Sequence, residues 1–342
     1  MANREKILNI LEYNNTKECG FWKGRPHKDA LKQYLFDLKL KDEEELSAFV
    51  GDDLKWTSAD ASYKHPEGTP VFDTMHGQTR ISDCQPGVFM DTTSIKEVEA
   101  FPWPDLKYIN LDEYIAEIKQ ARENNYALLG GFWSPYFHIA ADFFGMENYF
   151  IKMYTDPKIV EAVTEHIVEY YYQANKMLLE KAGEYIDIIF FGNDFGTQLD
   201  LFMSPEMFKK YVYPGVVKLT NLAKKHNKKV ALHSCGSVYR VIPLLIDAGI
   251  DVLHPIQAKA KNMDAKYLND NYKDDIVFMG GLDTQVILPF GSEKEIEEEV
   301  ERLMDIFGPN FILSPSHEAL LKNVSTKNLM AMANAVHKKK RK

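Results

Sequence analysis

The chain has 342 residues, of which 45% are hydrophobic, and its 41 basic and 50 acidic residues give a net charge of −9. This composition is that of a folded globular protein, and its acidic balance argues against nucleic-acid binding, which needs a basic surface. No stretch approaches the ~18 apolar residues of a membrane helix, and the charged N-terminus does not resemble a signal peptide, so we expect a cytoplasmic protein.

The N-terminal part begins with a charged helical pattern, which predicts a helical extension. Residues 18–22 read as a short strand, and residues 27–40 as the helix that follows it. Residues 51–106 are irregular and contain five prolines. Their many aromatic side chains argue against disorder, so we expect a structured, lid-like excursion over the mouth of the domain. Within it, residues 70–91 contain two strand-like runs.

From residue 126 onward, short apolar runs alternate with amphipathic helical patterns. Asp156-Pro157 and Ser204-Pro205 are typical of helix starts, with a capping side chain followed by proline. The predicted strands are 126–132, 186–191, 229–233, 250–254, 276–280 and 311–314, and the predicted helices are 156–183, 204–225, 238–248, 263–269, 293–307 and 325–338.

Continuous apolar strands separated by helices predict a parallel sheet with helices on its faces. Six strand–helix units are readable, residues 18–40 supply a seventh, and residues 70–91 are the candidate for the eighth. Eight units close a (β/α)8 barrel, so the α/β fold expected is a TIM barrel forming a single domain over residues 1–342. An open, doubly wound sheet is the alternative, although no G-x-G-x-x-G motif follows any strand.

The three cysteines and the basic C-terminal residues each lead to one further expectation. Cys19, Cys84 and Cys235 are too few, and odd in number, for a disulfide framework, so a functional cysteine here would be a thiolate or a metal ligand. Residues 337–342 form a basic tail, which we interpret as a solvated helix end rather than a binding segment.

The strongest chemical signal is His233-Ser234-Cys235-Gly236, at the end of the strand 229–233. Alternate residues of a strand face the same side, so His233 and Cys235 would both face the mouth of the barrel, and an imidazole with a thiolate suits Zn²⁺. His317, just after the strand 311–314, is the expected third ligand, with Glu318 or water as a fourth. The alternatives are a buried polar pair at a strand end and a histidine bonded to its loop.

Other polar residues also follow predicted strands. Asp194 and Gln198 follow the strand 186–191, His254 ends the strand 250–254, and Asp283 ends the run Gly280-Gly-Leu-Asp. A carboxylate at a barrel strand end suits acid–base work, and an amide or imidazole suits substrate binding. Turn and helix capping are the alternatives for the two aspartates.

Several of these motifs together resemble the uroporphyrinogen decarboxylase superfamily. They are His233-Ser-Cys-Gly, Gly280-Gly-Leu-Asp, Asn193-Asp-Phe-Gly-x-Gln and Ser314-Pro-Ser-His, with the helix starts at Asp156-Pro157 and Ser204-Pro205. The resemblance covers about residues 126–338 and implies a (β/α)8 barrel. Its decarboxylase branch implies a homodimer.

The decarboxylase branch is matched at His317 but not at its arginine-containing N-terminal motif. The nearest counterpart, Trp22-Lys-Gly-Arg25-Pro, keeps one arginine, so Arg25 is the expected substrate contact. Asp52-Asp53 lies near the position of that branch's pyrrole-binding aspartate. A substrate with eight carboxylates needs guanidinium clamps, and the chain has only seven scattered arginines.

The second branch comprises cobamide-dependent methyltransferases, which bind zinc through His-x-Cys and a later cysteine. His233 and Cys235 match the first two ligands, and His317 stands where the family has its third. The resemblance implies that zinc binds a thiol, alcohol, ether or amine, and that a methyl group passes between this heteroatom and the corrinoid of a partner protein. Asp194, Gln198 and Asp283 would orient the substrate. The alternatives are a metal-free decarboxylase of a carboxylated tetrapyrrole and a non-catalytic barrel that binds a corrinoid or small ligand.

Overall fold

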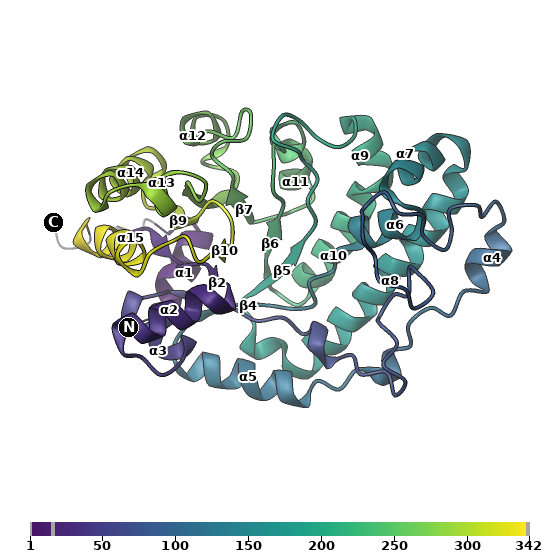
Figure 1. The fold of residues 1–342 in the computed structure, drawn as a ribbon, viewed down its shortest axis with the longest axis horizontal. Helices are drawn as coiled ribbons and strands as arrows, with labels where there is room; N and C mark the ends of the chain where they lie inside the picture. Colours follow the sequence, from purple (N-terminus) through teal and green to yellow (C-terminus); the bar gives the residue numbers. More distant parts are fainter. Residues whose placement is uncertain (1, 15–17, 340–342) are drawn as a thin grey trace.

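The computed structural model describes residues 2–14 and 18–339, and its centre is a parallel sheet of eight strands (Figure 1). The strand order is β1 (Gly20–Phe21), β9 (Phe311–Pro315), β8 (Val277–Leu282), β7 (Val252–Ile256), β6 (Lys229–His233), β5 (Ile188–Gly192), β4 (Ala127–Gly130) and β3 (Leu54–Trp56). The two outer strands meet, because the amide of Asp53 donates to the carbonyl of Phe21 at 2.9 Å. The sheet is therefore a nearly closed barrel, which confirms the predicted (β/α)8 fold.

The eighth strand lies elsewhere than predicted. It is β3, at Leu54–Trp56, and residues 70–91 contain no strand. A strand of three residues is too short to show a hydrophobic period. The apolar residues of 70–91 instead join an aromatic cluster, in which Phe72 contacts Tyr170 and Phe89 stacks on Phe143 with ring centres 5.1 Å apart.

The helices surround the barrel, and they include every helix that the sequence predicts. They are α1 (Arg4–Leu11), α2 (Lys28–Leu38), α3 (Glu43–Val50), α4 (Ile95–Glu99), α5 (Asp112–Glu123), α6 (Tyr136–Phe144), α7 (Met146–Thr155), α8 (Pro157–Ala182), α9 (Pro205–Tyr211), α10 (Tyr213–Lys225), α11 (Ile242–Asp247), α12 (Ala265–Tyr272), α13 (Ile287–Phe290), α14 (Glu293–Phe307) and α15 (Thr326–Lys339). The helix predicted over 204–225 is two helices, because Pro214 lacks the N–H that a continuous helix needs there.

None of the helices in the described ranges is both long and apolar enough to cross a membrane. Residues 337–339 of the predicted basic tail are the end of α15, and residues 340–342 lie outside the described residues.

Helix α1 covers the end of the barrel opposite the mouth, which we define as the end where the strands have their C-termini. Ile7 and Ile10 pack against Gly20 of β1, and Lys6 forms a buried ion pair with Asp53. The amide of Phe21 donates to the same carboxylate at 2.9 Å. Asp53 therefore joins α1, β1 and β3 at the seam of the barrel.

Replacing Asp53 by asparagine is expected to lower the free energy of unfolding by about 3 kcal/mol, because it leaves the Lys6 ammonium buried without a counter-charge. Urea unfolding measures the change. Glu113→Gln is the control, since its ion pair with Lys64 is exposed and contributes less than about 1 kcal/mol. Equal losses for the two variants would contradict the role of Asp53 in closing the barrel.

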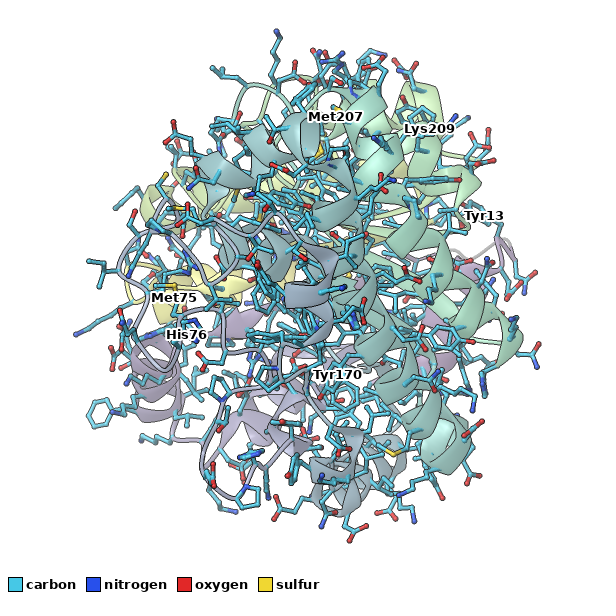
Figure 2. All side chains as sticks on the ribbon, turned by 90° about the vertical axis from the view of Figure 1, so that its right-hand side faces the viewer. Tyr13, Met75, His76, Tyr170, Met207 and Lys209 are labelled. Carbon is cyan, nitrogen blue, oxygen red and sulfur yellow. The ribbon has the colours of Figure 1, made fainter. Side chains whose placement is uncertain are left out.

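The excursion of residues 51–106 packs on α6, α7 and α8. Arg80 donates to the carbonyl of Asp142, and the amide of Met146 donates to the carbonyl of Asp83. Figure 2 shows Met75 and His76 of this excursion at one edge of the molecule and Tyr13, beside α1, at the opposite edge. Met75 and His76 therefore lie on the side of the molecule away from Tyr13, and the predicted position of the excursion over the mouth stays a prediction.

Candidate metal centre

Three potential metal ligands come together where β5 and β6 end. The register pairs Gly192 of β5 with His233 of β6, so Asp194, two residues beyond β5, lies beside Cys235. The Nε2 atom of His233 lies 3.2 Å from Oδ1 of Asp194 and 3.4 Å from Sγ of Cys235. The amide of Cys235 donates to Oδ1 of Asp194 at 2.8 Å. We call Asp194, His233 and Cys235 the triad.

The triad has the chemistry of a cation site. Its three ligand atoms, an imidazole nitrogen, a sulfur and a carboxylate oxygen, lie within 4.8 Å of one another. These are the donor types of three-ligand zinc sites, which leave a fourth position open. The residues present therefore fit a zinc ion, and the structure adds Asp194 to the predicted ligands His233 and Cys235.

Burial and neighbouring charges shift the pKa values of two residues of the triad. Burial acts to raise the pKa of Asp194, but the hydrogen bond and charge of His233 outweigh it and hold this pKa well below its usual value. Burial, together with the charges of Asp194 and Glu318, raises the pKa of the Cys235 thiol far above its usual value. A cation is the group that would balance this negative charge and favour the thiolate.

His254 lies behind His233 and is fully buried, with 0% of its surface exposed. Their Nδ1 atoms form a hydrogen bond of 3.1 Å, and burial lowers the pKa of His254 well below the usual value, which keeps its ring neutral. This bond directs Nε2 of His233 to Asp194 and Cys235, as the outer partner of a metal-binding histidine does. The predicted substrate contact of His254 stays a prediction, and its observed contact is with His233.

His317 lies near the triad but outside it. Its ring centre is 6.4 Å from that of His233, and its Nδ1 accepts the amide of Ala319 at 3.0 Å. Two imidazoles on one tetrahedral zinc, with Zn–N distances of about 2 Å, have ring centres about 5 Å apart. His317 would have to move to become a ligand, and its metal role stays a prediction. Glu318 lies between the two histidines, and its buried Oε2 accepts no hydrogen bond from the described residues.

The remaining predicted residues lie around the mouth. The Asp283 carboxylate accepts the amides of Gln285, Val286 and Ile287, so it caps its turn, and its catalytic role stays a prediction. Gln198 is exposed, and only its carbonyl has a recorded contact.

Arg25 extends its guanidinium over the ring of Trp56 at 4.8 Å, and its amide donates to the carbonyl of Glu318 at 2.6 Å. It thus lies at the mouth, on β2 (Arg25–Pro26), which pairs with β10 (Ala319–Leu320).

An aromatic floor closes the barrel below the triad, and sequence reasoning missed it. Trp133 contacts both His233 and Trp56, with ring centres 5.3 and 5.0 Å away, and Phe190 packs against Trp56, Trp133 and His254. Trp56 ends β3, and Trp133 follows β4. The rule that residues at strand ends line the site would have identified Trp133, which directly follows the predicted strand 126–132, whereas the strand that ends at Trp56 was not predicted.

His138, on α6, is a second missed residue. Its Nε2 accepts the amide of Asp194 at 2.9 Å, and burial lowers its pKa, which keeps it a neutral acceptor. It fixes the backbone that carries Asp194.

A parallel eight-stranded barrel with a His/Cys/Asp triad at its strand ends defines a (β/α)8-barrel protein with a candidate metal centre. The family model of uroporphyrinogen decarboxylase (URO-D) matches residues 79–339, and the chain belongs to this family. The predicted family resemblance is thereby confirmed.

The solved structures that are similar to the chain include a methyltransferase and a putative methionine synthase. A methyltransferase from Methanosarcina mazei has a TM-score of 0.64 and 15% identity, over 99% of each chain. A putative vitamin-B12-independent methionine synthase from Listeria monocytogenes has a TM-score of 0.46 and 12% identity, over 94% of this chain and 99% of the other. The first likeness concerns the fold. No curated protein matches the chain.

Proposed function

We propose that the chain is a zinc-dependent methyltransferase that moves a methyl group between the heteroatom of a small molecule and the corrinoid of a partner protein. The observation that carries this proposal is the triad, because the family fold alone is shared by decarboxylases. An aspartate, a histidine and a cysteine converge at the barrel mouth, where enzymes of this fold keep their active sites.

Each part of the site would have a separate role in binding zinc and excluding water. Asp194, His233 and Cys235 would hold the ion, and His254 would keep Nε2 of His233 directed at it. Bound zinc would supply a Lewis acid that lowers the pKa of a thiol or alcohol, or polarises an ether oxygen. The aromatic floor of Trp133, Trp56 and Phe190 would exclude water from below, which strengthens electrostatic interactions at the triad.

The arginines of the structure favour this proposal over porphyrinogen decarboxylation. Six arginines are described, and five of them pair with carboxylates: Arg4 and Arg122 with Asp187, Arg80 with Asp142, Arg240 with Asp200, and Arg302 with Glu299. Arg25, the sixth, lies at the mouth and forms no ion pair with the described residues. One guanidinium cannot neutralise a substrate with eight carboxylates.

The contacts of Asp52 and Asp53 also favour the methyltransferase over a porphyrinogen decarboxylase. Asp52 accepts the amide of Lys23 and forms a buried ion pair with its ammonium, and Asp53 pairs with Lys6. Both carboxylates therefore serve the barrel seam and are not available to a pyrrole ring.

The rim of the mouth supports the partner in this proposal. Exposed apolar side chains follow β5, β8 and β9: Leu199, Val286, Phe290 and Leu321, which are between 53% and 72% exposed. We call these four residues the rim. Apolar side chains around the mouth are suited to docking a partner protein, which must bring its corrinoid to the triad.

The experiment combines metal analysis with a methyl-transfer assay. We expect about one zinc per chain in purified protein and, with a corrinoid protein and methylated ethers, alcohols, amines or thiols, the change in corrinoid absorbance that accompanies methylation. Absence of zinc after reconstitution, or carbon dioxide release from a porphyrinogen by metal-free protein, would refute the proposal and favour the decarboxylase. Tight corrinoid binding without turnover would instead indicate a binding barrel.

Replacing Phe290 by aspartate is expected to raise the KM for the corrinoid protein roughly tenfold, because a charge would be buried in an apolar contact. Zinc content should not change. Phe36→Asp is the matched control, since Phe36 is 85% exposed on α2, outside the rim. Equal kinetics for the two variants would contradict docking at the rim.

A further inference from the structure

A cavity of about 270 Å³ opens next to the triad. It lies between the segments that follow β7, β8 and β9. Its lining residues are neutral or apolar, with one histidine: Gln257, Thr284, Gln285, Ser316, His317, Ala319, Leu321, Asn323 and Val324. We call it the neutral cavity. Its volume is just below the ~300–1,000 Å³ of drug-sized ligand sites, so it suits a small molecule.

Two residues connect the neutral cavity to the triad. The Oε1 atom of Gln257 accepts the amide of Gly236, the neighbour of Cys235, at 2.6 Å. His317, on the same border, has its ring centre 6.4 Å from that of His233. A molecule in the cavity would therefore lie within one side chain of the triad.

Charged side chains lie beside the cavity but do not line it. The Glu318 carboxylate is directed at the Nδ1 atoms of His233 and His317, at 3.6 and 3.4 Å. Asp283 accepts three backbone amides and lies 3.8 Å from Lys259, and neither residue lines the cavity. No Asp, Glu, Lys or Arg stands among its described lining residues. A charged ligand would lose hydration there without gaining a counter-charge, which is costly.

The lining nevertheless offers hydrogen bonds. Within the described chain, the side-chain amides of Gln285 and Asn323 have no recorded partner, whereas the hydroxyls of Thr284 and Ser316 are paired with each other. Leu321 and Val324 supply apolar contact. This combination recognises a ligand that is uncharged but carries an oxygen.

From this lining we infer that the methylated substrate is an uncharged ether or alcohol that occupies the neutral cavity, rather than a methylated ammonium or a methylated acid. That this ligand is a substrate rests on the proposed function. The preference for an uncharged ligand rests on the cavity alone, so binding tests it separately.

Three probes of nearly equal size test the inference: 2-methoxyethanol, methoxyacetate and 2-methoxyethylammonium. Ligand-observed NMR, by saturation transfer on the zinc-reconstituted protein at pH 7, measures binding of each. We expect 2-methoxyethanol to bind, and the two charged probes to bind at least about tenfold more weakly. No corrinoid and no turnover enter this measurement.

One substitution places a charge in the cavity. Gln285→Glu should reverse the preference, with binding of 2-methoxyethylammonium raised about tenfold and that of 2-methoxyethanol lowered. Gln120→Glu, on the exposed face of α5, is the matched control and should keep the wild-type order.

Several results would overturn the inference: no binding by 2-methoxyethanol, equal binding by a charged probe, or an order unchanged by Gln285→Glu. Failure of the proposed function is recognised differently, because zinc or methyl transfer would then be absent while selective binding of 2-methoxyethanol persisted.

Discussion

Replacing Cys235 by alanine is expected to weaken zinc binding by on the order of a hundredfold to a thousandfold. Structural zinc sites contribute about 10–16 kcal/mol, which is about 3 kcal/mol for each of four ligands. Sγ of Cys235 lies 3.4 Å from Nε2 of His233, so the thiolate would be a direct ligand of an ion held by both. Methyl transfer at limiting zinc should fall in parallel with the loss of bound zinc. Elemental analysis after dialysis against a chelator, and the corrinoid assay, measure the two losses.

The chain contains its own controls for this substitution. Cys84 is exposed in the excursion, and Cys19 is buried in the core, outside the triad. Cys84→Ala should keep full zinc and activity. Cys19→Ala tests whether loss of a buried cysteine reduces metal content merely by weakening the fold. Zinc retained by Cys235→Ala, or lost equally by all three variants, would contradict the triad as the metal centre.

The longer strands of the barrel could be predicted from the sequence, whereas the three-residue strand β3 could not. The strands β5 to β9 have five or six residues each, most of them apolar, and the sequence placed all of them within two residues. β3 has three residues, of which only Leu54 is fully buried, so no periodicity marked it. The aromatic residues around Phe72 and Phe89 resembled a strand because a loop packed on helices can be as apolar as a sheet.

The predictability of the site depended on register. The motif His233-x-Cys235 identified two members of the triad, because both stand on one segment. Asp194 was expected to orient substrate, since nothing in the sequence says that Gly192 pairs with His233. That pairing brings Asp194 to 3.2 Å from Nε2 of His233, whereas His317 follows β9, three strands away from β6 in the sheet order.

The floor of the site was invisible for a related reason. Trp56 and Trp133 lie far apart in the sequence, at the end of β3 and after β4. Only closure of the barrel brings their rings to 5.0 Å. Pair contacts across a barrel depend on the tilt and stagger of its strands, which no local pattern encodes.

Asp194 and His317 are the two candidates for the third protein ligand of the zinc ion, and the geometry favours Asp194. Asp194→Ala is expected to weaken zinc binding by on the order of a hundredfold, whereas His317→Ala should leave it within about threefold of wild type. Competition with a chromophoric chelator gives the affinities. Asp194→Asn keeps the acceptor for the Cys235 amide and separates loss of the ligand from loss of that hydrogen bond.

Cobalt substitution adds a readout that a merely structural role would not move. With Co²⁺ in place of zinc, the sulfur-to-metal absorption should persist in His317→Ala, and its visible bands should shift in Asp194→Asn, because the carboxylate is replaced by a weaker ligand. Wild-type affinity and spectrum in Asp194→Ala, together with metal loss in His317→Ala, would restore His317 as the ligand. Asp194 would then be left to align Cys235 through the backbone amide that it accepts at 2.8 Å.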